Sequence, residues 1–191
     1  MPTHKRGISV TSDWLTNRVK ALNTRFHESA LAHQQQLTKP PGSLGQLEDI
    51  AVRLSAMQAQ AKPSIDKVNI SIFAADHGVV AAGVSAFPQE VTGQMVANFA
   101  AGGAAISVLA KSLGARLEVV DVGTLQDPGD MPGVISHRAG AGTANLHEQD
   151  AMDQEQLDIA LAAGRDAVAR AKENQADLFI GGDMGIGNTT A

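Results

Sequence analysis

The chain has 191 residues, of which 43% are hydrophobic and 18% charged, so it is long enough for one globular core with or without a small appendage. Its net charge of −5 and its 3% aromatic content argue against a nucleic-acid-binding surface. It has no cysteine, which excludes disulfides, zinc thiolates and cysteine nucleophiles. Its N-terminus does not resemble a secretory signal, and we find no apolar stretch near the roughly 18 residues of a membrane span. We therefore expect a cytoplasmic protein.

Residues 1–62 predict a helical arm, part of a small helical domain, with no strand of its own. Ser12 and Asp13 can cap a first helix, and its apolar positions recur every three or four residues: Leu15, Val19, Leu22, Phe26 and Ala30. The Pro-Pro-Gly of residues 40–42 breaks that helix. Ser43 with Gln46 resembles a capping box before a second apolar stripe, formed by Leu47, Ile50, Leu54 and Met57.

Residues 63–191 predict an α/β core. Apolar runs at 68–73, 117–122 and 177–181 are typical of buried strands, and a shorter strand is expected near Val134 and Ile135 in the otherwise irregular segment 123–151. Between these runs lie three helical stripes: Val91, Met95 and Phe99; Ile106, Leu109 and Leu113; and Leu157, Leu161, Val168 and Ala171. Strands that alternate with helices favour a Rossmann-like parallel sheet with helices on both faces.

Three predicted strands end in acidic or glycine-rich triplets at residues 76–78, 121–123 and 181–183. Ligands of parallel sheets bind at the carboxyl ends of the strands, and all three triplets would meet at that edge. Taken singly, each triplet is better explained by Asp and Gly turning the chain after a strand. Together they favour a site.

The segment after the last predicted strand is typical of a phosphate-binding loop. Its glycines let backbone N–H groups approach an anion, and Asn188, Thr189 and Thr190 supply the N-cap chemistry of a following helix. The candidate phosphate-binding residues are Gly185, Ile186, Gly187, Asn188, Thr189 and Thr190. Because the chain stops at Ala191, we expect it to be the front part of a longer enzyme.

Two further features have a functional and a structural interpretation. His77 could bind a metal ion, but none of the six histidines pairs with another at helical spacing, so we predict no metal site. The segment 83–92 combines an aromatic ring with hydrogen-bonding side chains and suits a flat heteroaromatic ligand. It is equally well explained as a loop and helix N-terminus with Phe87 packed inward.

Five motifs occur in order along the chain: KPPGSLG at 39–45, ADHGV at 75–79, GVSAFPQEVT at 83–92, VVDVG at 119–123 and MGIGNTT at 184–190. Together they resemble the nicotinate-nucleotide–dimethylbenzimidazole phosphoribosyltransferase family over roughly residues 39–191, as the N-terminal half of its longer members. The resemblance implies transfer of the phosphoribosyl group of nicotinate mononucleotide to dimethylbenzimidazole, giving α-ribazole phosphate and nicotinate for the cobalamin lower ligand. It also implies a homodimer and no cofactor.

The same resemblance assigns roles to residues. It places the benzimidazole pocket in the segment that holds Ser85, Phe87, Pro88 and Met95. The family's catalytic base is a glutamate beyond Ala191, so we expect residues 1–191 alone to be inactive. Family members commonly carry Glu where Asp183 stands here, and Asp183 is the candidate supporting acid, with a side chain shorter by one methylene.

Two alternatives from other classes remain open on the residues alone. Val119–Thr124 also resembles the strand end of a magnesium-dependent, diphosphate-type phosphoribosyltransferase, although it carries one acid rather than two. The chain could also be a non-catalytic module that binds a nucleotide or a benzimidazole. Magnesium dependence and turnover distinguish these possibilities.

Overall fold

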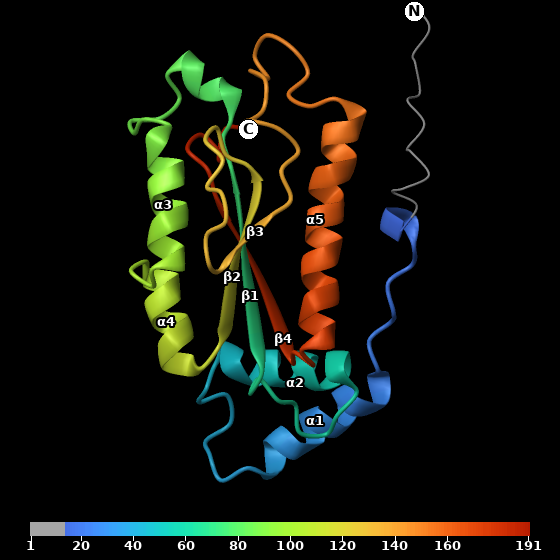
Figure 1. Ribbon diagram of the computed structural model, residues 1–191. Helices are drawn as coiled ribbons and strands as arrows, with labels where there is room; N and C mark the ends of the chain where they lie inside the picture. The colour runs from blue at the N-terminus through green and yellow to red at the C-terminus, as the bar shows by residue number, and fades with distance from the viewer. Residues whose placement is uncertain (1–13) are drawn as a thin grey trace, which may run out of the picture. The chain divides into compact units, whose positions relative to one another are not determined.

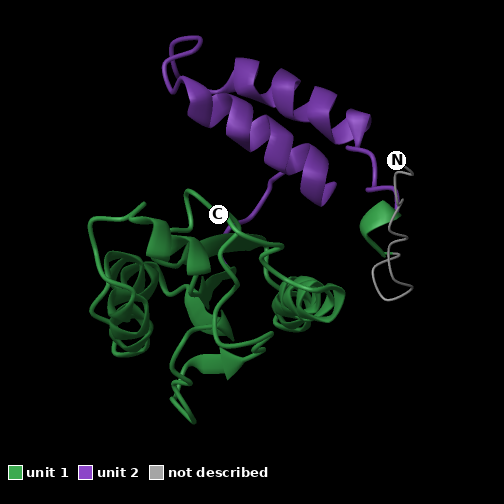
Figure 2. Ribbon diagram, turned by 90° about the horizontal axis from the view of Figure 1, so that it is seen from above, with its two compact units in different colours: residues 1–16, 67–191 green, residues 17–66 purple. Residues whose placement is uncertain are grey.

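A computed structural model describes residues 14–191. Residues 17–66 form one compact unit, and residues 67–191 belong to a second (Figure 2). The smaller unit is helical, and the larger one contains the sheet.

The smaller unit is a pair of helices, α1 (Thr24–Gln36) and α2 (Gln46–Gln58). They meet where Asn23 N–H donates to the Ala56 carbonyl at 3.1 Å and the Ser55 hydroxyl donates to the Phe26 carbonyl at 3.4 Å. Ala30, Val52 and Ala56 are buried there. The prediction of two helices is confirmed, but both predicted starting points need correction.

The first helix begins ten residues later than the apolar spacing predicts. Asn23 is its N-cap, because its side-chain oxygen accepts from the Phe26 N–H at 3.3 Å. Val19, assigned above to the buried stripe, precedes the helix and is 89% exposed, and Ser12 and Asp13 lie outside the described residues. The predicted capping box at Ser43 is also wrong. The N-cap of α2 is Gly45, whose φ of 55° favours glycine and which makes no side-chain cap bond.

The larger unit contains a four-stranded, all-parallel sheet in the order β3-β2-β1-β4 (Figure 1). The strands are β1 (Val68–Ala75), β2 (Arg116–Gly123), β3 (Val134–Ser136) and β4 (Leu178–Met184). The central strand places Ile72 beside Val119 of β2 and Gly182 of β4. All four predicted strands are therefore confirmed, together with their parallel pairing.

Helices cover both faces of the sheet, as Figure 1 shows with the sheet seen edge-on. On one face lie α3 (Glu90–Ala100) and α4 (Ala105–Leu113), and on the other lies α5 (Gln154–Glu173). A core cluster joins α3, α4 and the strands and is formed by Ile70, Ile72, Ala74, Val96, Phe99, Ala104, Ala110 and Val119. A short 3₁₀ helix, η2 (Gly78–Ala82), follows β1.

The predicted start and stop signals of the helices are confirmed more fully than the predicted rows of buried apolar residues. Asp153 and Gln156 form a reciprocal capping box at the start of α5, and Gly114 ends α4 in the left-handed conformation at φ 65°. Leu109 and Leu113 of α4, however, are 57% and 76% exposed, because this helix turns Ser107 and Ala110 inward instead. On α5 the buried row consists of Ala163, Ala167 and Ala171.

The stretch Glu90–Leu113 is long and apolar enough, by composition alone, to cross a membrane, with a mean hydropathy of 1.4. This corrects our statement that no apolar stretch approaches that length. The stretch divides into α3 and α4 at Gly102 and Gly103, and Val96, Phe99 and Ala110 pack against the sheet. Its hydropathy thus reflects a sheet-covering role.

Glu118 ties α5 to the sheet. Arg170 donates from Nε and Nη2 to the two Glu118 oxygens at 3.1 and 2.8 Å, and the Ser71 hydroxyl donates to Oε1 at 2.8 Å. Burial alone would raise the pKa of Glu118, but the hydrogen bonds from Arg170 and Ser71 outweigh it and hold the pKa below its usual range.

Candidate active site at the β1–β4 switch point

The strand order locates a crevice. From β1 the chain passes through α3 and α4 to β2 on one side, whereas β4 pairs with the opposite edge of β1. The order of the sheet therefore reverses between β1 and β4, and ligands of such sheets bind outside the carboxyl ends of the strands at this point. The segments that follow are residues 76–78 after β1 and 185–190 after β4.

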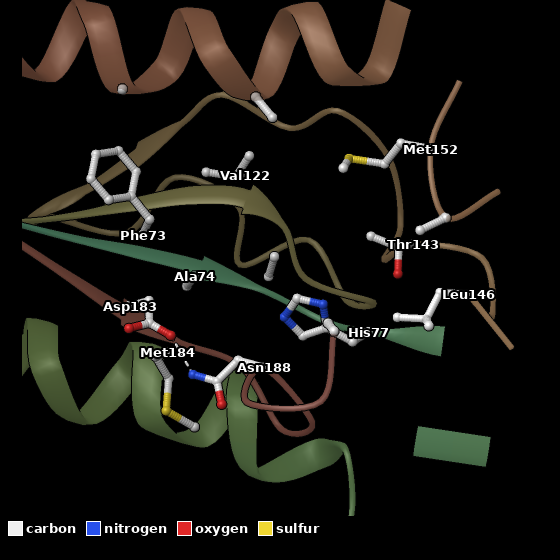
Figure 3. A pocket seen from close by; sticks show the side chains of 15 residues that line it. Phe73, Ala74, His77, Val122, Thr143, Leu146, Met152, Asp183, Met184 and Asn188 are labelled. Atoms are coloured by element: carbon white, nitrogen blue, oxygen red, sulfur yellow. Dashed lines mark hydrogen bonds between the residues drawn. The ribbon is translucent and has the colours of Figure 1, made fainter. Parts of the chain in front are cut away.

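A cavity of about 530 Å³ opens at this point (Figure 3). Its lining is mostly apolar and includes Phe73, Ala74, Val122, Leu146, Met152 and Met184. The polar side chains in it are few, and Figure 3 shows them around one space: His77, Thr143, Asp183 and Asn188. An apolar cavity with a few convergent polar groups is the usual form of a small-molecule site.

The loop after β4 requires its glycines. A Cβ on Gly185 would collide with the Ala75 carbonyl oxygen and lie 2.9 Å from His77 Nε2. Gly187 has a φ of +88°, which L side chains rarely adopt, and a Cβ there would lie 2.8 Å from Val80 Cγ2. The loop is thus packed against the end of β1 and the residues that follow it.

The loop leaves backbone donors for a ligand, among them the N–H groups of Gly187 and Thr189. Its first turn is closed by Asn188 N–H, which donates to the Gly185 carbonyl, and by Thr190 N–H, which donates to the Gly187 carbonyl, both at 3.0 Å. The Ile186 N–H donates to the Thr92 hydroxyl at 3.1 Å. Within residues 14–191, the N–H groups of Gly187 and Thr189 have no protein acceptor. Free N–H groups in a glycine turn are what an anion site needs. Phosphate binding by this loop stays a prediction.

Asp183 lies beside this loop at the end of β4. Asn188 Nδ2 donates to Asp183 Oδ2, so the carboxylate holds a loop side chain as well as lining the cavity. Its role as a supporting acid stays a prediction.

His77 is the ionisable group that was considered above as a metal ligand and for which no metal site was predicted. Burial lowers its pKa below the usual value, and the nearby Asp76 and Asp183 offset that shift in part. The imidazole is therefore neutral near pH 7 and can both donate and accept a hydrogen bond in the cavity. Within the described part of the chain, no three His, Asp or Glu side chains are grouped as metal ligands.

We expect His77 to make stability pH-dependent. Its folded pKa lies below its unfolded pKa of about 6.5, so the unfolded chain binds the proton more readily and stability falls as the pH drops below that value. His77→Gln should make this acid-side fall shallower in urea denaturation curves at several pH values. His147→Gln, at an exposed position, is the control. An unchanged slope in His77→Gln would contradict this expectation.

The predicted benzimidazole residues do not line the cavity. Phe87 is 66% exposed, and its N–H donates to the Ser85 hydroxyl at 3.2 Å. Pro88 precedes α3, and Met95 on α3 packs against the core cluster. Of the candidate site residues, the cavity brings together only Asp183 and Asn188. The binding role of the other residues stays a prediction, and inward packing of Phe87, the alternative, is not seen.

Two of the three strand-end acids do not reach the cavity. Asp121 is fully buried and binds Arg138, whose Nη1 lies 2.5 Å from Oδ2, while Oδ1 accepts from the N–H groups of Gly123 and Thr124. Asp76 is 2% exposed and accepts from Leu125 N–H at 2.7 Å. Asp121 thus shapes the loop after β2, and for it the structural explanation of an acid after a strand is the better one. Asp76 also lines a second cavity, of about 410 Å³, and its Oδ1 is buried without a hydrogen-bond partner among the described residues.

Sequence reasoning missed the cavity wall contributed by Thr143, Leu146 and Met152. They lie in a segment that was assigned only as loop. Gly78 N–H donates to the Thr143 hydroxyl at 3.2 Å, and Thr143 N–H donates to the Asp76 carbonyl at 3.0 Å. These contacts join residues more than 60 positions apart, and no local spacing pattern indicates them.

Comparison with known proteins identifies the class first. The chain matches the phosphoribosyltransferase family model over residues 19–191. It is 62% identical over 182 residues to the nicotinate-nucleotide–dimethylbenzimidazole phosphoribosyltransferase of Pseudomonas fluorescens. The aligned region covers 95% of this chain and 52% of the relative. The enzyme of the same name from Xanthomonas euvesicatoria is 56% identical, with the same coverage. The crystal structure of the Thermus thermophilus enzyme superposes with a TM-score of 0.83 at 47% identity, over 88% of this chain and 51% of that one.

The chain therefore belongs to the nicotinate-nucleotide–dimethylbenzimidazole phosphoribosyltransferase family. It spans about half the length of the curated relatives that it matches.

Proposed function

We propose that the complete protein transfers the phosphoribosyl group of nicotinate mononucleotide to dimethylbenzimidazole, giving α-ribazole phosphate and nicotinate for the lower ligand of cobalamin. The observation that carries the proposal is the glycine loop with free Gly187 and Thr189 N–H groups beside a mostly apolar cavity at the strand-order reversal. The names of the relatives supply the substrates.

The reaction makes three demands on the site. The bond between the ribose C1 and the pyridinium nitrogen breaks, and nicotinate leaves with a neutral ring nitrogen, so no acid has to protonate it. A benzimidazole nitrogen forms the new bond to C1, and the N–H proton of the ring must pass to a base. The phosphate has to be anchored, and the loop at 185–190 provides donors suited to it. The apolar side chains of Phe73, Val122 and Met152 line the cavity and suit a site that has to exclude water from the reactive C1.

We assign the base to a glutamate beyond Ala191, as the family resemblance implies, and give Asp183 the supporting role. The proposal includes a Rossmann-like core that is completed by a further part of the protein, and a homodimer as the working assembly. It includes no cofactor. The diphosphate-type alternative lacks its second acid at the end of β2, and Asp121 there is paired with Arg138.

Turnover tests the proposal. The complete protein is incubated with nicotinate mononucleotide and dimethylbenzimidazole, and α-ribazole phosphate is quantified by chromatography and mass. We expect turnover by the complete protein, and residues 1–191 alone should be slower by at least roughly 10²–10⁴-fold, the usual contribution of a general base. Turnover that requires magnesium and a diphosphate-bearing substrate would favour a diphosphate-type phosphoribosyltransferase. Binding without turnover by the complete protein would favour a non-catalytic module that binds a nucleotide or a benzimidazole.

A further inference from the structure

The first two turns of α3 contact the segments on both sides of the candidate crevice. Gln89, the N-cap residue, donates from Nε2 to the His77 carbonyl at 3.0 Å, on the β1 side. One turn later, the Thr92 hydroxyl accepts from the Ile186 N–H at 3.1 Å, on the β4 side. Helix α3 thus joins two segments that are more than 100 residues apart in sequence.

Thr92 itself is fully buried, with an exposed fraction of 0%. It is a polar residue on the face of α3 that also buries Val96 and Phe99. A helix that packs on a sheet normally buries apolar side chains there, and a buried hydroxyl is tolerated where it is hydrogen-bonded. The bond to Ile186 therefore accounts for a threonine at this position, where valine would have nearly the same shape.

This hydrogen bond also determines which donors the loop offers. Ile186 is half-buried, and its N–H donates to Thr92, so this donor is already occupied. With that peptide group fixed, and with Gly187 at a φ of +88°, the N–H groups of Gly187 and Thr189 remain without a protein acceptor. An anion that binds these donors would find them already oriented, which reduces the conformational entropy lost on binding.

We propose that Thr92 is a positioning residue of the phosphoribosyl-transfer site: it holds the loop at 185–190 in its anion-binding shape through Ile186 and does not touch the substrate. This inference rests on the proposed function for the identity of the anion. The hydrogen bond between Thr92 and Ile186 is independent of the proposed function and can be tested separately.

The test compares Thr92→Val, which keeps the shape and removes the acceptor, with Thr92→Ser, which keeps the acceptor, in the complete protein. Ser107→Ala is the matched control, since it removes another buried hydroxyl bond, from Ser107 to the Phe99 carbonyl at 3.0 Å on α4, away from the loop. Three quantities are measured for each variant: amide hydrogen exchange at Ile186, affinity for nicotinate mononucleotide, and affinity for dimethylbenzimidazole.

We expect Thr92→Val to lose exchange protection at Ile186 and to bind the nucleotide about five- to tenfold more weakly, equivalent to about 1–1.4 kcal/mol. The affinity of Thr92→Val for dimethylbenzimidazole should be unchanged. Thr92→Ser should keep the exchange protection at Ile186 and the nucleotide affinity of the wild type, and Ser107→Ala should change neither of these two quantities. Normal nucleotide affinity in Thr92→Val would overturn the proposal, as would an equal loss in Ser107→Ala. If the wild-type protein binds no nucleotide, the proposed function fails. In that case, retained protection in Thr92→Val would overturn the positioning role as well.

Discussion

Gly185→Val should abolish measurable binding of nicotinate mononucleotide while the protein remains folded. The added Cβ would collide with the Ala75 carbonyl oxygen, which is strand backbone and cannot move aside without disturbing the pairing of Ala75 with Gly123 of β2. The loop must therefore move away from β1. Each charge-assisted hydrogen bond to phosphate that is lost costs about 1.5–3 kcal/mol, so the loss of the Gly187 and Thr189 N–H donors together weakens binding by at least about 100-fold.

Gly187→Val should have the same effect for a different reason, because its φ of +88° is strained for any side chain. Gly93→Ala is the matched control. It lies in α3, where an added Cβ meets nothing within 4 Å, and alanine there should stabilise the helix by about 1 kcal/mol. Calorimetric titration with nicotinate mononucleotide and with dimethylbenzimidazole measures all three variants. Equal losses for the two ligands would mean that valine unfolded the whole site, and unchanged nucleotide affinity would remove this loop from the phosphate.

The sheet could be predicted from the sequence because its signals are local. The runs that became β1, β2 and β4 are short and rich in apolar residues, and the helices between them are bounded by short-range signals such as the Asp153–Gln156 capping box at the start of α5. The start of α1 was misplaced because apolar spacing continues through Leu15, Val19 and Leu22 before the helix begins at Thr24. The Asn23 cap decides that boundary.

The candidate site was predicted in part, and the missing part depends on contacts that are distant in sequence. The glycine loop carries a local signal, and it lies where the strand order places it. Contacts between segments distant in sequence carry no such signal: Arg138 is 17 residues from Asp121, and Thr143 is 65 residues from Gly78. An aspartate at the end of a strand looks the same in the sequence whether its side chain lines a cavity, as that of Asp183 does, or pairs with a buried arginine, as that of Asp121 does. Only the tertiary structure separates the two.

Arg138→Met should destabilise the protein by about 3–5 kcal/mol, the usual cost of leaving one member of a buried ion pair unpaired. Asp121 has no exposed surface, and Arg138 is 17% exposed. Arg138 also donates to the hydroxyl and the carbonyl oxygen of Thr124, at 3.0 and 2.7 Å, so its loss releases the loop after β2 as well. Methionine retains the apolar stem of the arginine, which confines the change to the guanidinium group.

The double variant Asp121→Asn/Arg138→Met separates the charge from the packing. Asparagine can still accept from the Gly123 and Thr124 N–H groups, which donate to Asp121 Oδ1 at 3.0 and 2.8 Å, but it leaves no buried charge. We therefore expect the double variant to be more stable than Arg138→Met alone. Arg165→Met is the control, because the Arg165–Asp166 pair is 50% and 38% exposed and such pairs contribute about 0–1 kcal/mol. Urea denaturation measures all three variants. If Arg138→Met costs no more than Arg165→Met, the Asp121 carboxylate does not depend on Arg138, and its position at the end of β2 needs another explanation.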